Sequence, residues 1–116
     1  MSKYKITTTQ LEAQLQVLRA LHVDPLLSQR ELSNQLGISL GKANYCVQAL
    51  LLKGWVKTTN FRNSQNKIAY SYLLTPKGID QKVKLTIAFL MKKQEEFEML
   101  SHEIKQLTEE SLENNQ

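Results

Sequence analysis

The segment 39–53 carries the side chains best suited to recognise a ligand by hydrogen bonding. Asn44 and Gln48 are four residues apart, so a helix would present both carboxamides on one face. A carboxamide matches the donor and acceptor that adenine presents in the major groove of DNA. Lys42 can reach a guanine or a phosphate, and Tyr45 can contact a thymine methyl group or donate to a phosphate. The residues of this segment that we predict to face DNA are Ser39, Leu40, Gly41, Lys42, Asn44, Tyr45 and Gln48.

Two further groups of polar residues accompany that segment. Ser28, Gln29 and Arg30 open a second predicted helix, whose first amides and positive dipole end favour a phosphate. The loop 62–67 carries two cations, of which Arg62 is the better suited to a narrow minor groove. For both groups the alternative interpretation is an ordinary solvated surface. The loop residues that we predict to lie along DNA are Arg62, Asn63, Gln65, Asn66 and Lys67.

Charge is divided unevenly along the chain. The chain has 116 residues, the length of one ordinary domain, and a formal net charge of +4. Residues 1–78 carry 10 Lys or Arg and 3 acids, a net charge of +7, whereas residues 79–116 carry 5 Lys and 8 acids, a net charge of −3. This division favours a polyanionic partner for the basic part of the chain.

Other classes of site find little support in the sequence. Cys46 is the only cysteine, which excludes a disulfide scaffold and a multi-thiolate zinc site within one chain, and we expect it to be an inert core thiol. His22 and His102 have no partner at metal-ligand spacing, and no Ser-His-Asp set or phosphate-binding glycine loop is visible. We therefore expect no enzyme activity, metal or cofactor. The sequence also lacks an 18-residue apolar run and an apolar N-terminal signal segment, so we expect a cytoplasmic protein without membrane contact.

Three short helices are predicted in the first half of the chain. In residues 9–23, apolar side chains recur at helical spacing, with Leu11, Leu15, Leu18 and Val23 near one stripe. Residues 28–36 begin with a capping box, because Glu31 follows Ser28 by three positions. Residues 39–53 have an apolar stripe that includes Cys46. Only the turn at Gly37 and Ile38 separates the last two helices, which predicts a helix-turn-helix.

A β-hairpin and a long helix are predicted to follow. Residues 55–61 and 68–74 are rich in β-branched and aromatic side chains and predict two strands. Thr75 and Pro76 form a helix start, and the helical pattern then runs to about residue 113. The predicted fold is mainly α with a small β-hairpin wing: a winged helix-turn-helix domain at 1–75 and a long dimerisation helix at 76–116.

The long helix has the heptad pattern of a coiled coil. Apolar residues recur every seven positions from Val83 to Ile104, and these are a positions; the matching d positions near the end are also apolar, whereas Thr86 and Lys93 occupy the earlier ones. The alternative is a single helix that folds back on its own domain. The residues that we predict to form a homodimer interface are Val83, Leu90, Phe97, Leu100, Ile104 and Leu107.

The segment LSQRELSNQLGISLGKANYCVQALLLKGWVK at 27–57, continued by NFRNSQNKIAYSYLLTPKGIDQK at 60–82, resembles the MarR superfamily of winged-helix transcription regulators. It is most similar to the short subgroup associated with exopolysaccharide gene clusters. The resemblance implies a homodimeric regulator of double-stranded DNA, a repressor, with half-sites about 10 bp apart or a multiple of that. Members of the superfamily often bind a small-molecule effector, but the sequence does not indicate which residues would form such a pocket.

Two other functions remain open at this point. A winged helix can act as a protein–protein adaptor, with the C-terminal coiled coil as its working surface. RNA or single-stranded DNA binding needs exposed aromatic side chains beside the basic groups, and only Tyr45 qualifies. The adaptor predicts no salt-sensitive DNA binding, which separates it from the regulator.

Overall fold

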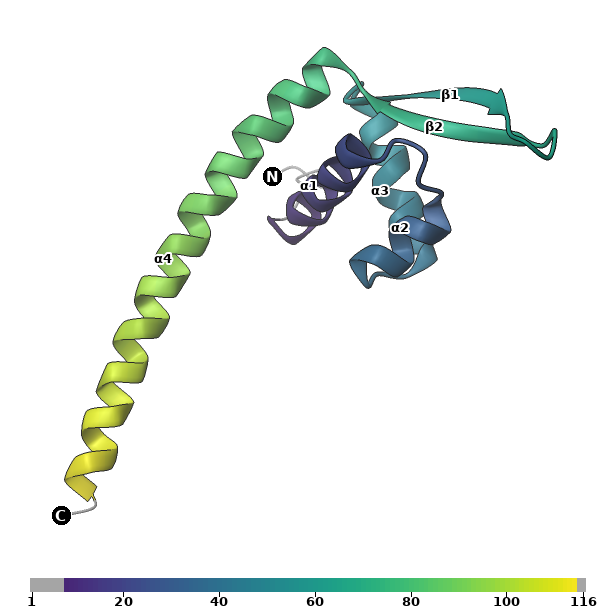
Figure 1. Cartoon of the computed structure of the whole chain (residues 1–116). Coiled ribbons are helices and arrows are strands. Elements are labelled where there is room, and N and C mark those ends of the chain that lie inside the picture. Colours follow the sequence, from purple (N-terminus) through teal and green to yellow (C-terminus); the bar gives the residue numbers. More distant parts are fainter. Residues whose placement is uncertain (1–7, 115–116) are drawn as a thin grey trace, which may run out of the picture. The chain divides into compact units, whose positions relative to one another are not determined.

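A computed structural model describes residues 8–114 of the chain (Figure 1). Its elements confirm the predicted fold class, a mainly helical chain with a two-stranded hairpin and a long C-terminal helix. The strand predicted at 55–61 is shifted by one residue, and the predicted ends of the helices differ by one residue at most. Residues 1–7 and 115–116, which the predicted domains include, lie outside the described residues. In chain order the elements are α1 Thr8–Val23, α2 Gln29–Leu36, α3 Leu40–Leu52, β1 Val56–Arg62, β2 Ile68–Leu74 and α4 Pro76–Asn114.

The chain divides into two compact units, and the first of them ends at Leu85. The division comes ten residues after the boundary at 75 that the sequence suggested, because the first turns of α4 group with the preceding elements and Leu85 packs against their core. The second unit, from Thr86 onward, is the remainder of α4.

Local hydrogen bonds define α2 and the turn that follows it. The Ser28 hydroxyl accepts from the Glu31 amide at 3.1 Å, and the Glu31 carboxylate accepts from the Ser28 amide at 3.2 Å, so the predicted capping box is confirmed. Gly37 ends the helix with φ 66°, a conformation that side chains disfavour. The Ser33 hydroxyl donates to the Ile38 carbonyl at 2.6 Å and fixes the turn between α2 and α3.

The core of the first unit lies between α1, α2 and α3. α1 contributes Val17, Leu18 and Leu21, and α2 contributes Leu32. The prediction that Val23 shares this stripe is wrong, because its side chain is 88 % exposed. Val23 is the last residue of α1 and lies about 200° round the helix from Leu21, outside the buried stripe. The contribution of α3 consists of Ala43, Cys46, Val47 and Leu50.

The hairpin is attached to the helices at its base. β1 and β2 are antiparallel and extend as a ribbon beyond α1–α3 (Figure 1). Trp55 and Val56, where β1 begins, are buried in the core. The Tyr72 amide donates to the Pro25 carbonyl at 2.9 Å, so β2 also hydrogen-bonds to the segment after α1. The base is therefore fixed, whereas the outer part of the hairpin is exposed.

The first turn of α4 lies directly against the chain at Trp55. The Thr75 amide donates to the Trp55 carbonyl at 3.0 Å, and the Thr75 hydroxyl donates to the Gly54 carbonyl at 2.6 Å. The same hydroxyl accepts from the Gly78 amide at 3.0 Å. A Cβ atom on Gly78 would lie 1.9 Å from the Trp55 carbonyl oxygen. Only glycine permits this approach.

Candidate nucleic-acid interface

The two faces of α3 have different surroundings. Its inner side chains are buried in the core, as the apolar stripe predicted. Every outer residue that we predicted to face DNA is exposed, and together they form one polar surface on the helix. We call this set the α3 outer face: Leu40, Gly41, Lys42, Asn44, Tyr45 and Gln48.

Ser39 begins α3 and is the remaining predicted residue of this segment. Its hydroxyl oxygen accepts from the Lys42 amide at 3.1 Å and caps the helix. Its hydroxyl hydrogen remains available to donate, so capping and a hydrogen bond to a phosphate are compatible. Ser28 has the same arrangement at the start of α2, where Gln29 is half-buried and Arg30 is exposed.

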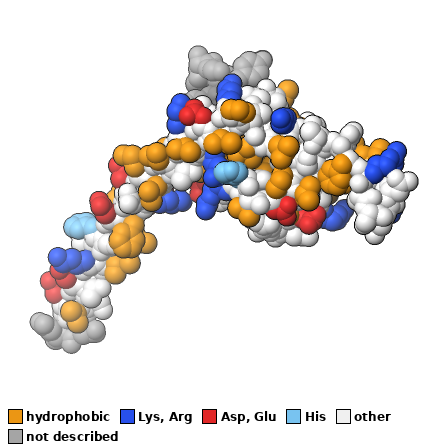
Figure 2. Space-filling model, turned by 45° about the horizontal axis from the view of Figure 1, so that its top comes forward, with side chains coloured by type: hydrophobic (Ala, Val, Ile, Leu, Met, Phe, Trp, Pro, Cys, Tyr) orange, Lys and Arg blue, Asp and Glu red, His pale blue; other side chains and the backbone are white. Residues whose placement is uncertain are grey.

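The tip of the hairpin is ordered by its own side chains. The Asn63 side-chain oxygen accepts from the Gln65 and Lys67 amides, both at 3.0 Å, and is thereby occupied within the turn. Asn66 has φ 59°, and its carbonyl oxygen accepts from the Arg62 guanidinium at 3.1 Å. The Arg62 side chain is thus held across the turn, and its other guanidinium N–H groups can still donate to a ligand. Figure 2 shows cationic side chains at this end of the hairpin.

Lys53 fixes the other end of α3, a role that the sequence did not indicate. Its ammonium group donates to the side-chain oxygen of Gln14 on α1 and lies 4.5 Å from the centre of the Trp55 ring. Gln14 is 2 % exposed, so this bond satisfies a buried acceptor. Burial lowers the pKa of Lys53. Its partner is 39 positions away in the sequence, so no local signal could have found the pair.

Cys46 is 2 % exposed on the inner side of α3, where the sequence placed it. Burial raises the pKa of its thiol, against a smaller opposing effect of Lys42. A thiol of this kind is a poor nucleophile at neutral pH. Among residues 8–114, no cluster of three His, Cys, Asp or Glu side chains could hold a metal ion. None of the described helices combines the length and apolar character needed to cross a membrane.

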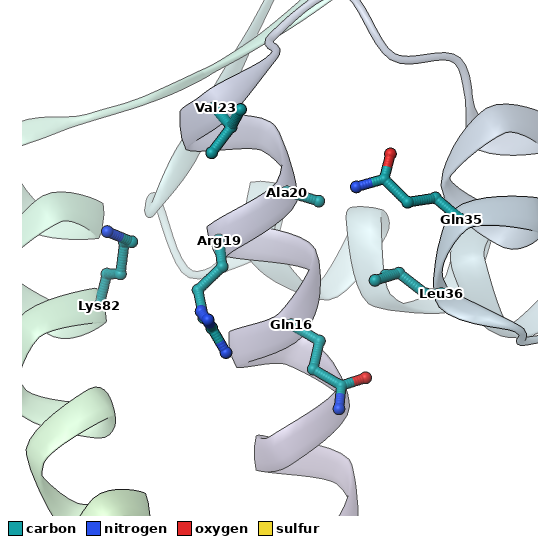
Figure 3. Close-up of a pocket in the computed structure, with 7 residues that line it drawn as sticks. All are labelled: Gln16, Arg19, Ala20, Val23, Gln35, Leu36 and Lys82. Atoms are coloured by element: carbon teal, nitrogen blue, oxygen red, sulfur yellow. The ribbon is translucent and has the colours of Figure 1, made fainter.

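A cleft of about 660 Å³ lies between helices of the first unit. Gln35 and Leu36 point from α2 toward α1, and α1 and α4 contribute Arg19 and Lys82 (Figure 3). The lining combines two cations and two carboxamides with apolar side chains. The sequence analysis missed this convergence, because each helix contributes only a few of the residues. The complete lining is Gln16, Arg19, Ala20, Val23, Gln35, Leu36 and Lys82.

The heptad side chains of α4 are exposed. Each of the six predicted interface residues, Val83, Leu90, Phe97, Leu100, Ile104 and Leu107, has at least 53 % of its surface accessible. Figure 2 shows hydrophobic side chains at intervals along α4. Leu85 packs against the core, and Val83 lies about 200° round the helix from it. Val83 therefore lies on a different side of α4 from the residue that packs on the core.

Comparison with known proteins connects this geometry to DNA-binding folds. Residues 10–57, from α1 into β1, match the winged helix-turn-helix DNA-binding family. No curated protein sequence is significantly similar to the chain.

Three of the solved structures that share the fold illustrate the similarity. A Streptococcus mutans protein is 18 % identical with a TM-score of 0.65, and the match covers 79 % of this chain and 87 % of that one. A MarR/EmrR family transcriptional regulator from Acinetobacter is 19 % identical with a TM-score of 0.54, over 82 % of this chain and 62 % of that one. MepR of Staphylococcus aureus, solved as a DNA complex, is 22 % identical with a TM-score of 0.57, over 77 % and 60 %. The chain spans about three fifths of the latter two proteins and has the winged helix-turn-helix fold that they share.

Proposed function

We propose that this chain is a MarR-type transcription regulator that binds double-stranded DNA as a homodimer. The observation that carries the proposal is the α3 outer face, whose polar residues are exposed on a helix that the core and both ends hold in place. A DNA complex is known for MepR, which shares the fold. In this arrangement Asn44 and Gln48 read bases, whereas Arg30, Arg62 and Lys67 contact the phosphate backbone or the minor groove.

Binding of the purified protein to fragments of its own promoter region tests the proposal at two salt concentrations. We expect tight binding that weakens as salt rises, because phosphate contacts release counterions. The double variant Lys42→Ala/Asn44→Ala should bind roughly 10-fold to 100-fold more weakly, since a good base contact contributes about 1–3 kcal/mol. Lys105→Ala is the matched control, because it removes an exposed cation from α4. Equal binding by the double variant and the wild type would refute the assignment of the reading surface.

The adaptor is the second candidate, and the exposed heptad face of α4 is the observation that favours it. It predicts no salt-sensitive DNA binding and a partner protein on that face. The same binding experiment separates the two functions. Failure to bind any promoter fragment at low salt would favour the adaptor.

Repression of exopolysaccharide genes is the finer part of the proposal. Its support is the resemblance of residues 27–57 and 60–82 to the exopolysaccharide-associated subgroup. We place the regulator in the cytoplasm, where it meets DNA. Deletion of the gene should raise transcripts of an exopolysaccharide cluster, and a fall in those transcripts would indicate an activator.

The cleft between α1, α2 and α4 supports a role as an effector site. Its two cations and two carboxamides suit a carboxylate, and its apolar residues suit an aromatic or aliphatic body. Benzoate is a simple probe, and calorimetric titration should detect binding that Arg19→Ala weakens. Arg30→Ala, which changes an arginine outside the cleft, is the control. Identical binding by the wild type and Arg19→Ala would exclude this site.

A further inference from the structure

The heptad face of α4, which consists of its a and d residues, is a largely apolar and exposed surface. Its apolar a and d residues from Ile79 to Leu107 are 43–70 % exposed, and Val83 lies about 200° round the helix from Leu85, which packs on the core. A second copy of the chain is the partner required by the homodimer proposed above, on which this inference rests. Two helices can pair through such a face in parallel or in antiparallel orientation, and these orientations align different charges.

Charge along α4 is segregated between its two halves. Residues 76–93 carry five Lys and one Asp, a net charge of +4. Residues 94–114 carry seven Glu and one Lys, a net charge of −6. Asp80 pairs with Lys84 of the same half at 3.0 Å, and across the junction Glu96 lies 3.5 Å from Lys93. The first half remains basic overall and the second half acidic.

This segregation favours antiparallel pairing. Packed helices lie about 8–10 Å apart, a distance close to the Debye length of about 8 Å at physiological salt, so charges on the two helices still interact. A parallel pair would align each basic half with a basic half and each acidic half with an acidic half. It would also place Lys93, at a d position, directly opposite Lys93 of the second copy. An antiparallel pair instead aligns basic with acidic halves at both ends, and it places the two Lys93 side chains in adjacent layers rather than directly opposite each other.

The a and d positions allow a register of the antiparallel pair in which most layers are apolar. When Val83 faces Leu100 of the second copy, Ile79 faces Ile104 and Thr86 faces Phe97. Lys93 then faces Leu90, and its ammonium can extend toward Glu96, its neighbour on the same helix. In this register no glutamate that flanks the a and d positions faces a glutamate of the second copy. If the second helix is moved by one heptad, so that Val83 faces Leu107, Glu96 of one copy faces Glu96 of the other. The glutamates therefore favour the register with Val83 opposite Leu100 over this slide.

We propose that α4 pairs with α4 of a second copy as an antiparallel coiled coil, with Val83 opposite Leu100. The interface is isologous, because the basic half of each helix meets the acidic half of the other. Since opposite charges are aligned, dimerisation should weaken as the salt concentration rises. A parallel pair, which aligns like charges, should show the opposite salt dependence.

Cysteine cross-linking of the full chain tests the orientation. Both positions are half-exposed, so substitution leaves the core intact. The double variant Val83→Cys/Leu100→Cys should form a covalent dimer on oxidation, whereas each single variant should remain monomeric on a non-reducing gel. Val83→Cys/His102→Cys is the matched control, because residue 102 lies about 200° round the helix from Leu100. The wild type controls for Cys46, which is buried.

Sedimentation of the wild type separates this inference from the proposed function. A dimer with cross-linking only in the double variant supports the antiparallel pair. Efficient cross-linking of Leu100→Cys and of Val83→Cys alone would show a parallel pair and overturn it. A dimer that no variant cross-links would also overturn the orientation and register. A monomer at all concentrations would overturn the inference and the homodimer together, while DNA binding would stand or fall in its own assay.

Discussion

Substitution of Gly78 by alanine should destabilise the protein, although alanine is the better helix former. The intrinsic preference for alanine is at most about 1 kcal/mol in a helix interior and smaller in a first turn. This preference is opposed by a steric clash, because α4 lies directly against the backbone of Trp55. The new Cβ would lie 1.9 Å from the Trp55 carbonyl oxygen and 2.8 Å from its carbonyl carbon. Both are backbone atoms, so no side-chain rotation can relieve the contact.

The magnitude follows from what must move. An oxygen at 1.9 Å has to retreat by about 1 Å to reach the shortest contacts that Cβ atoms make. Overpacking of this kind costs about 1–3 kcal/mol. The same movement strains the hydrogen bond from the Thr75 amide to the Trp55 carbonyl, which contributes about 1 kcal/mol. We expect a net loss of about 2 kcal/mol in the free energy of unfolding, or roughly 5–10 °C in Tm.

Urea denaturation followed by circular dichroism measures this loss. The protein concentration must be the same for all variants, because dimerisation would contribute to stability. Gly41→Ala is the matched control, since a Cβ at that position meets no atom within 4 Å. It should be neutral or slightly stabilising. Gly78→Ala at or above wild-type stability, or an equal loss in both variants, would refute the steric reasoning.

Three further predictions concern α3 and the hairpin. Arg62→Ala should reduce the dependence of log Kd on log salt by about 1, and an unchanged slope in a salt titration would place Arg62 away from phosphate. Lys53→Ala should lower the free energy of unfolding, measured by urea denaturation, by about 1–3 kcal/mol, because the buried oxygen of Gln14 loses its donor. Lys57→Ala, at an exposed site, is the control and should lower it little. Equal effects of the two substitutions would argue against the hydrogen bond between Lys53 and Gln14. Cys46 should react with a thiol reagent much more slowly in the folded protein than in urea at neutral pH, because the thiol is buried and burial raises its pKa; similar rates would contradict its burial.

Local signals in the sequence were sufficient for the secondary structure. The capping box at Ser28 and the end of α2 at Gly37 depend on residues within a few positions of each other, and both appear in the structure as predicted. Periodicity likewise placed Cys46 on the inner side of α3. It was misleading at Val23, because spacing alone does not show where neighbouring helices stop covering the last turn of α1.

Contacts between distant segments had no such signal. In the sequence Gly78 is an ordinary residue of a first helical turn, and only the structure shows that it lies against the backbone of Trp55. The bond between Lys53 and Gln14 joins the end of α3 to α1. The cleft near Arg19 draws its lining from three helices, and none of their individual patterns predicts a cavity. Such features depend on how the helices pack, which a single sequence specifies only indirectly.

The contacts that hold α3 in place and the residues that we propose to recognise DNA lie on different sides of this helix. Ser39 caps one end of the helix, Lys53 is bound at the other, and the inner face supplies the core. The side chains of Asn44 and Gln48 are exposed on the opposite face, outside these contacts. Substitutions on that face should therefore alter what the protein binds with little effect on its stability, whereas substitutions of the inner face should unfold it. Because α3 is fixed at both ends and along its inner face, substitutions on its exposed outer face can change binding specificity without a change of fold.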